Sequence, residues 1–259
     1  MGVLNVTPDS FSDGESFLDA EAAVAQGIAM AQAGADIIDV GGESTRPGAE
    51  PVSATEELKR VIPVVEKLAR FTVSVDTMKS EVAEQALAAG ARIVNDISAL
   101  RTDARMVEVV RDGGAGLVLM HMKGTPQTMQ QNPQYTNVVA EVREFLAARI
   151  AFAESRGVKK SQIAVDPGIG FGKTVEQNLR LLAELESLQA LGCSVLAGTS
   201  RKSFIGKTLG REANERLWGT AATVAWAVAH GAKIVRVHDV AEMRDVVRMV
   251  EALQVAKRN

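Results

Sequence analysis

Short apolar runs rich in β-branched residues recur along the whole chain and alternate with longer stretches of helical periodicity. The runs are continuously apolar, which is typical of strands buried on both faces of a parallel sheet. They cover residues 2–6, 36–40, 73–76, 93–96, 117–121, 163–166, 194–198 and 234–238. Eight such units in 259 residues give about 32 residues per unit, which predicts a (β/α)8 TIM barrel in a single α/β domain over residues 1–259.

The helical stretches between the runs carry their own start and stop signals. Ser53 and Glu56 form a capping-box pattern before an apolar series at helical spacing, in which Pro63 predicts a kink. Four stretches end at a glycine just before the next strand, as expected for a left-handed residue after a helix. These glycines are Gly34, Gly90, Gly157 and Gly231. A doubly wound open sheet is the competing fold, but "NVTPDSFSDG" after the first run is not its glycine fingerprint.

Charge, cysteine count and the length of apolar runs limit the binding partners and the compartment that the chain can have. The formal net charge is −3, which argues against a general nucleic-acid or anionic-membrane surface. The single cysteine, Cys193, excludes an internal disulfide framework and fits a reducing compartment. No apolar run reaches membrane-span length, and no charged-then-apolar leader opens the chain. We therefore expect a cytoplasmic protein with small-molecule substrates, no nucleic acid and no membrane.

Polar residues follow almost every predicted strand. Because the C-terminal ends of barrel strands meet at one rim, these residues predict a shared polar pocket, although any one carboxylate can equally cap the next helix. The strand-end residues are Asn5, Asp39, Asp76, Asn95, Asp96, His121, Asp166, Ser200, Arg236 and His238. Basic groups after strands two, seven and eight make one side of the pocket suited to an anion. These groups are Arg46, Lys202, Arg236 and His238.

Several other chemistries are disfavoured by the residues present. His230 lies at a helix end and is interpreted as structural, and Cys193 begins a strand on the opposite rim. A Schiff-base lysine would be Lys173 or Lys202, but both lie in loops rather than inside a strand. The stretch "DPGIGFGKT" (166–174) resembles a phosphate loop. However, only three residues separate its first glycine, Gly168, from the Gly-Lys pair that begins at Gly172, and the Walker pattern needs four.

The strand-end motifs together resemble those of the dihydropteroate synthases. The resemblance extends from the first residues to the last helix. It rests on "LNVTPDSFSDG" (4–14), "IDVGGESTRPGA" (38–49), "SVDTMK" (74–79), "NDIS" (95–98), "LMHMKGTPQTMQ" (119–130), "DPGIGFGKT" (166–174), "GTSRKSFIG" (198–206) and "RVHDV" (236–240). It implies the condensation of 6-hydroxymethyl-7,8-dihydropterin diphosphate with p-aminobenzoate, which gives 7,8-dihydropteroate and diphosphate in folate biosynthesis.

The resemblance also implies a role for individual residues. The pterin is expected to contact Asp76, Asn95, Asp166, Lys202, Arg236, Met120 and Phe171. The diphosphate is expected to contact Asn5, Thr45, Arg46, Arg236 and His238, with Asn5 as the protein contact of Mg²⁺. The p-aminobenzoate is expected to contact Phe11, Thr45, Pro47, Lys202 and Ser203.

The resemblance implies a dissociative mechanism. Diphosphate leaves first, the arylamine then attacks an allylic-type cation, and the catalytic residues are Asp13, Arg236 and Lys202, with Asp13 stabilising the cation. Asp9 is interpreted as a residue that organises the turn.

Two departures from the family pattern are visible. Family members usually have further residues before the first strand, so residues preceding Met1 are expected to be missing, and Glu15 stands where a second glycine is common. The intact Arg-Pro-Gly of the second loop predicts sulfonamide sensitivity. The alternatives are a methyltetrahydrofolate-binding corrinoid methyltransferase domain and a non-catalytic pterin-binding protein. The family also implies a homodimer, although core packing explains the apolar residues of the last helices equally well.

Overall fold

Eight parallel strands form one sheet whose spatial order follows the chain order from β1 to β8. The computed structural model describes residues 1–7, 16–44 and 49–257. The strands are β1 (Gly2–Asn5), β2 (Ile38–Gly41), β3 (Val73–Asp76), β4 (Ile93–Asp96), β5 (Gly116–Met120), β6 (Ile163–Asp166), β7 (Ser194–Ala197) and β8 (Ala232–Val235). A parallel bridge from Gly2 to Val237, just after β8, joins the last strand to the first. The predicted (β/α)8 barrel is confirmed.

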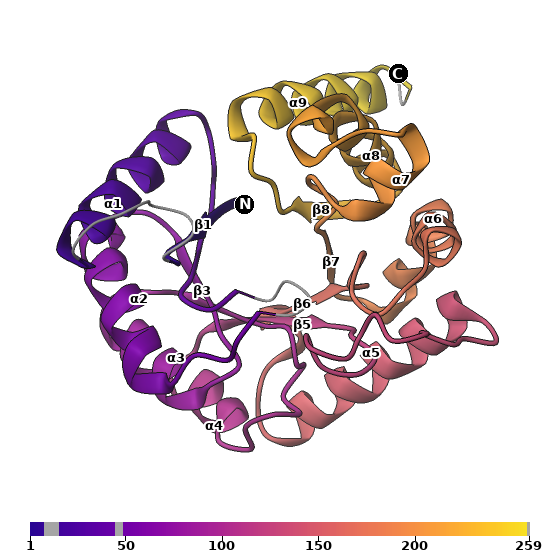
Figure 1. The fold of residues 1–259 in the computed structure, drawn as a ribbon. Helices are drawn as coiled ribbons and strands as arrows, with labels where there is room; N and C mark the ends of the chain where they lie inside the picture. The colour runs from indigo at the N-terminus through magenta and orange to yellow at the C-terminus, as the bar shows by residue number, and fades with distance from the viewer. Residues whose placement is uncertain (8–15, 45–48, 258–259) are drawn as a thin grey trace.

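Helices follow the strands and surround them on the outside (Figure 1). They are α1 (Ser16–Gln32), α2 (Ala54–Leu68), α3 (Ser80–Ala88), α4 (Met106–Asp112), α5 (Val138–Ser155), α6 (Val175–Ala183), α7 (Ser203–Leu209), α8 (Leu217–Ala229) and α9 (Val240–Ala256), with short 3-10 turns η2 (Lys160–Gln162), η3 (Leu185–Leu191) and η4 (Ala213–Glu215). Both α7 and α8 lie between β7 and β8, so that unit has one helix more than the others.

Local signals act at the helix ends as the sequence predicts. Gly34, Gly90, Gly157 and Gly231 all have positive φ, between 93° and 111°. Ser53 caps α2 by accepting a hydrogen bond from the Glu56 backbone at 3.2 Å. The Glu56 side chain accepts a hydrogen bond from Arg60 Nε at 3.0 Å and does not return to the backbone of the cap residue. The predicted capping box is therefore half formed, because an i,i+4 ion pair competes for the carboxylate.

The sheet register brings the polar strand ends into one layer. Asp76 pairs with Gly41 on one side and with Asn95 on the other, and Met120 pairs with Asp166. Since paired residues of parallel strands share a face, these side chains point to the same side of the sheet. Beneath them a small apolar cluster fills the barrel interior. Its buried members are Met1, Val118, Ala164 and Leu196. The main core lies between the strands and the helices.

Candidate active site

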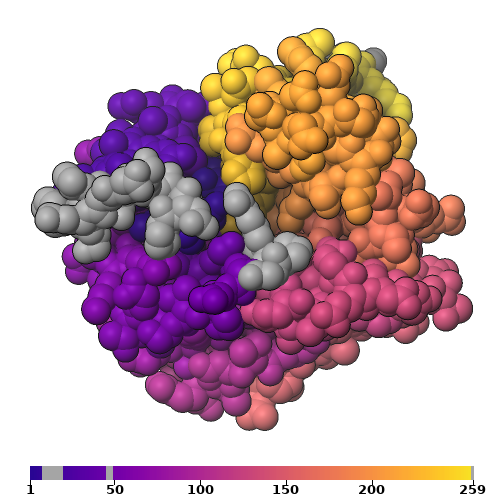
Figure 2. Space-filling view, viewed as in Figure 1, coloured from indigo at the N-terminus to yellow at the C-terminus, as the bar shows by residue number. Residues whose placement is uncertain are grey.

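A pocket opens at the mouth of the barrel, where the strands end. It is lined by Val3, Asp76, Asn95, Ile97, Met120, Asp166, Ile169, Phe171, Gly198, Ser200, Lys202, Arg236 and His238. Eight of these residues are ones the sequence assigned to a substrate, and they come from six different strands or the loops after them. In the space-filling view, the indigo and purple early segments and the orange and yellow late segments face each other across the centre of this face (Figure 2).

Arg236 is held at the mouth by two carboxylates. Its Nε donates to Asp39 Oδ2 at 2.6 Å, and a second guanidinium nitrogen donates to Asp76 Oδ2 at 2.7 Å. Burial alone would lower the pKa of Arg236, but the carboxylates of Asp39 and Asp76 outweigh it and raise that pKa above its usual range. Burial raises the pKa of Asp76, and Arg236 opposes that rise. The guanidinium is thus a fixed positive charge at the pocket.

The sequence placed Asp39 among the strand-end residues of the polar pocket but assigned it no substrate contact. The predicted strand ended at residue 40, which put Asp39 near its end, whereas β2 runs on to Gly41. Asp39 therefore lies inside the barrel, fully buried, and its Oδ2 also accepts from Asn95 Nδ2 at 3.0 Å. A carboxylate inside an apolar strand is rare unless it is paired, so its position in "IDVG" was the available signal.

The loop after β6 lies against the backbone of the loop after β5. Gly168 and Gly172 have positive φ, and a Cβ on them would come within 1.9 Å of the His121 carbonyl oxygen and 2.7 Å of the Lys123 carbonyl oxygen. Glycine is therefore required at these two positions, because neighbouring backbone already occupies the space of a side chain.

Lys202 and Phe171 form one wall of the pocket. The Lys202 ammonium lies 4.0 Å from the centre of the Phe171 ring. A Cβ on Gly170 would meet the Lys202 side chain at 3.0 Å, so the lysine stem crosses this glycine closely. Burial and then Arg236 lower the pKa of Lys202 to about 8, although Asp166 and Asp76 oppose them. Met120 packs in the same apolar cluster as Phe171 at the mouth.

His238 is a neutral imidazole at pH 7 in this structure. Burial and then Arg236 lower its pKa to about 4, and its Nδ1 lies 2.9 Å from Ser200 Oγ. The sequence counted His238 among the basic groups of the pocket. Burial and the nearby guanidinium disfavour a positive charge on His238, so Arg236 and Lys202 are the cations among the described residues that line this pocket. His238 remains able to donate or accept a hydrogen bond.

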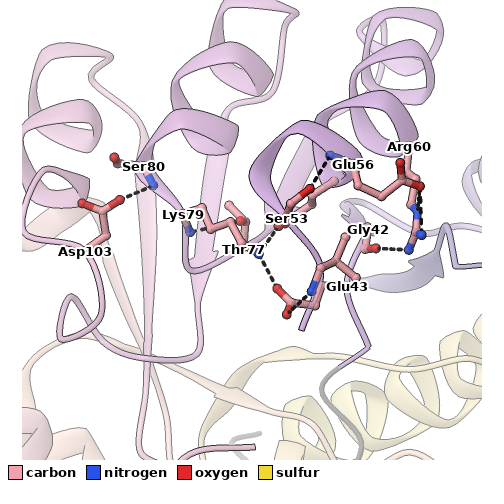
Figure 3. A network of polar contacts seen from close by, with 11 residues as sticks. Gly42, Glu43, Ser53, Glu56, Arg60, Thr77, Lys79, Ser80 and Asp103 are labelled. Carbon is pink, nitrogen blue, oxygen red and sulfur yellow. Dashed lines mark hydrogen bonds and ion pairs between the residues drawn. The ribbon is translucent and has the colours of Figure 1, made fainter. Parts of the chain in front are cut away.

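The loop after β2 is anchored beside the site by an ion-pair network (Figure 3). The Lys79 ammonium contacts Glu43 and Glu57, the latter at 2.6 Å. The other carboxylate oxygen of Glu43 accepts from the Val52 backbone at 3.1 Å, so one side chain joins both ends of the stretch from 43 to 52. Arg60 donates to the Gly42 carbonyl at 3.1 Å.

Some predicted site residues are not placed in the pocket. Asn5 ends β1 on the same rim, where it pairs with Gly41, but it is not among the lining residues. Ser203 begins α7 directly after Lys202. Five predicted residues, and Asp9, lie outside the described residues. The five are Phe11, Asp13, Thr45, Arg46 and Pro47.

The structure also places the two residues, His230 and Cys193, to which the sequence analysis gave no catalytic role. His230 is half-buried at the end of α8 and stacks on Trp226 with ring centroids 4.0 Å apart, in agreement with a structural role. Cys193 is partly buried beside the start of β7, away from the strand ends. A second hollow lies on the outside of the barrel between α3 and α4. Its charged residues include Glu84 of α3, Asp112 of α4 and Arg105 just before α4, which are exposed and are not strand ends.

An eight-stranded barrel whose mouth gathers buried acids, an amide and fixed cations defines an enzyme of the (β/α)8 class. The family model for pterin-binding enzymes matches residues 1–238. The chain belongs to this family of pterin-binding enzymes.

Curated relatives share this assignment along almost their whole length. The chain is 49% identical over 257 residues to the dihydropteroate synthase of Synechocystis, covering 98% of this chain and 89% of the relative. It is 48% identical over 262 residues to the dihydropteroate synthase of Escherichia coli K12, covering 100% and 93%. The resemblance to the dihydropteroate synthases is confirmed.

Solved structures agree with the fold. A Yersinia pestis dihydropteroate synthase in a sulfonamide drug complex superposes with a TM-score of 0.93 at 42% identity, covering 98% of this chain and 93% of that one. A Xanthomonas albilineans dihydropteroate synthase with 4-aminobenzoic acid superposes with a TM-score of 0.92 at 48% identity, covering 98% and 92%.

Proposed function

We propose that this chain condenses 6-hydroxymethyl-7,8-dihydropterin diphosphate with p-aminobenzoate to give 7,8-dihydropteroate and diphosphate. The observation that carries the proposal is the mouth pocket, in which Asp166 and Asn95 lie together with the Arg236 guanidinium and the Lys202 ammonium. Acids and an amide suit the donor-rich edge of a pterin, and cations suit a leaving diphosphate. Whole-length dihydropteroate synthase relatives support the same reaction.

The pterin ring is held between polar and apolar walls. Asp166 and Asn95 bind the aminopyrimidinone edge, while Asp76 and Lys202 contact other ring heteroatoms. Asp166 is buried and accepts from the Gly168 backbone at 2.7 Å, which fixes one of its oxygens and leaves the other for a ligand. Burial raises the pKa of Asp166, and Lys202 and Arg236 oppose that rise.

Three further residues complete the pterin subsite. The planar Arg236 guanidinium stacks on the ring face, a contact for which arginine is well suited. Met120 and Phe171 supply the apolar contacts, and they already belong to one buried cluster.

The diphosphate binds on the cationic side with Asn5, Thr45, Arg46, Arg236 and His238. Within the described residues, no group of three or more His, Cys, Asp or Glu is arranged to hold a metal ion. A Mg²⁺ ion bound by one amide, from Asn5, and otherwise by diphosphate oxygens and water fits that donor set. When bound, Mg²⁺ would neutralise charge on the leaving diphosphate.

The p-aminobenzoate subsite uses Phe11, Thr45, Pro47, Lys202 and Ser203. Lys202 supplies a positive charge for the benzoate carboxylate. Ser203 is exposed at the first position of α7, where its backbone can contribute a donor.

In the reaction the bond between the pterin methylene carbon and the diphosphate oxygen breaks, and the electron pair leaves with diphosphate. Asp13 and the π face of the pterin stabilise the resulting cation, and Arg236 stabilises the departing anion. The neutral arylamine nitrogen then forms the new carbon–nitrogen bond and releases its proton to solvent or diphosphate. No strong general base is required, since the attacking nitrogen is already neutral.

We propose that the enzyme is a homodimer that works in the cytoplasm as a single barrel domain. Large apolar side chains are exposed on the last helices, which form the orange and yellow part of the surface (Figure 2). Trp218 is 80% exposed, and Leu209, Met249 and Leu253 are more than half exposed. Large apolar side chains exposed on neighbouring helices are typical of an interface. No helix in the described part of the chain is long and apolar enough to cross a membrane.

One assay tests the reaction. The protein is incubated with the dihydropterin diphosphate, p-aminobenzoate and Mg²⁺, and dihydropteroate and diphosphate are measured together. We expect both products in equal amounts. Binding of the pterin without turnover would reject the synthase assignment. For the dimer, sedimentation at micromolar concentration is expected to give twice the chain mass, and Trp218→Glu is expected to shift it to the monomer.

A further inference from the structure

Lys173 is a buried cation that the proposed reaction does not use. Only 3% of it is exposed. Its Nζ lies 2.9 Å from the carbonyl oxygens of Gly168 and Phe171, and 3.0 Å from His121 Nδ1. The His121 carbonyl oxygen lies 3.4 Å away as a fourth acceptor. An ammonium group offers these acceptors three donors, whereas a neutral amine would have only two N–H donors. Burial lowers the pKa of Lys173 to about 7 and Asp166 opposes this, so the charged form of Lys173 is complete on the acid side of neutrality.

His121 acts as an acceptor in this cluster. Burial and then the charge of Lys173 lower the pKa of His121 to about 2, so its ring is neutral. With Nδ1 facing the ammonium, the ring proton is assigned to Nε2. The side chain of His121 packs edge-on against Phe145 at 4.9 Å, which holds the ring in place. The acceptor for Lys173 is therefore fixed before any ligand binds.

Several carbonyl groups of the loop after β6 accept hydrogen bonds from protein side chains. Gln130 donates to Gly170 at 2.9 Å, and the Tyr135 hydroxyl donates to Gly172 at 2.9 Å. Lys173 donates to two more carbonyls of this loop, those of Gly168 and Phe171. The Gly168 carbonyl also accepts from the Phe171 N–H at 3.0 Å and would keep that partner without Lys173. The Phe171 carbonyl would lose its charged donor, which is costly in a buried site.

Lys173 is linked directly to the residue proposed to bind the pterin edge. The Gly168 N–H donates to Asp166 at 2.7 Å, while the Gly168 carbonyl accepts from Lys173. Lys173 is also one of three cations that face Asp166, together with Lys202 from the loop after β7 and Arg236 from the segment after β8. His121, from the segment after β5, faces Lys173 as a neutral group.

We propose that Lys173 is a positioning residue of the pterin subsite, whose ammonium fixes the loop between Asp166 and Phe171 and helps to keep Asp166 ionised. The inference rests on the proposed function, since it assumes that Asp166 binds the pterin. It also gives the Gly-Lys pair of "DPGIGFGKT" a role that is not phosphate binding.

The test uses Lys173→Met, which keeps the length of the side chain and removes its donors and charge. The probe is 6-hydroxymethylpterin, which has no diphosphate, and its affinity is measured by calorimetry between pH 5 and 8. We expect binding at pH 7 to weaken about tenfold, the scale of one lost charge-assisted interaction. The acid limb of binding should also move to higher pH, because Asp166 loses a nearby cation and its pKa rises.

Two further variants sharpen the result. Lys173→Arg retains the charge and should keep the acid limb where the wild type has it. Lys59→Met, which alters an exposed lysine of α2, is the matched control and should bind like the wild type. If thermal unfolding shows that Lys173→Met does not fold, Lys173→Gln is used in its place.

The outcomes separate this inference from the proposed function. A folded Lys173→Met variant that binds the pterin within twofold of wild type, or whose acid limb is unmoved, overturns the inference and leaves the synthase assignment intact. A wild-type chain that does not bind the pterin at all rejects the proposed function itself.

Discussion

Glu57 and Lys79 offer a stability test that can be worked from the structure. Glu57 is fully buried at the start of α2, and one of its oxygens contacts the Lys79 ammonium at 2.6 Å. Its other oxygen has no hydrogen-bond partner among the described residues. Replacing Lys79 by Met therefore leaves a buried carboxylate without its cation. Breaking a buried pair in this way costs about 3–5 kcal/mol.

The expected consequence is large enough to measure by thermal or urea unfolding. For a chain of this size, about 1 kcal/mol corresponds to about 2–4 °C in Tm, so Lys79→Met should lower Tm by about 10 °C. Replacing both partners removes the unpaired charge. The double variant Lys79→Met with Glu57→Gln should therefore recover most of the loss, with a coupling energy of about 2 kcal/mol or more.

A matched exposed pair serves as the control. Arg105 and Glu84 approach to 3.3 Å, but both side chains are more than half exposed. Arg105→Met should therefore change stability by less than about 1 kcal/mol. The reasoning is refuted if Lys79→Met is as mild as this control, or if the losses in the double variant simply add.

The pH dependence of the same pair has a definite sign. Burial lowers the pKa of Lys79, but its hydrogen bonds to Glu43 and Glu57 outweigh burial and raise that pKa above its ordinary value. A raised lysine pKa gives stability that is complete below the unfolded value and is lost as pH rises through the folded value. The difference between wild type and Lys79→Met should therefore persist through neutral pH and shrink only in strongly alkaline solution.

Three predictions concern the reaction. Asp166→Asn removes a charged acceptor and should therefore lower kcat/KM for the pterin diphosphate about a hundredfold in steady-state assays. A change below fivefold would contradict the role of Asp166 in binding the pterin edge. Since the pKa of Lys202 is lowered to about 8, kcat/KM should fall as pH rises through that value. Lys202→Arg should move this alkaline limb of the pH profile to higher pH. If the limb does not move, Lys202 is not the group that causes it. Sulfamethoxazole should raise the apparent KM for p-aminobenzoate without changing kcat, and a chain that it does not inhibit would count against the proposed subsite.

The strand ends show how far the sequence leads. The eight strands and the gathering of Asp76, Asn95 and Asp166 at one mouth could be predicted, because a parallel barrel places every strand end on the same rim. The chemical types at that mouth, acids and an amide next to Arg236 and Lys202, can be listed from the residues at each strand end. For this reason eight of the assigned residues line one pocket.

Other features depended on contacts between distant segments. Whether Asp39 lies in the pocket or inside the barrel is decided by where β2 ends, and that is set by pairing with β1 and β3. The loss of charge on His238 requires the position of Arg236, and the need for glycine at 168 requires the position of the His121 carbonyl. The residue spacing within a single motif predicts none of these contacts.

The sequence by itself determined the barrel, the rim on which the site lies and the chemical types gathered there, because hydrophobic periodicity and strand direction act over a few residues at a time. Only the tertiary structure decided which acid pairs with Arg236, which imidazole stays neutral and which lysine is buried as a structural cation. Charge and protonation depend on desolvation and on neighbours within a few ångströms, and those neighbours come from strands far apart in the chain.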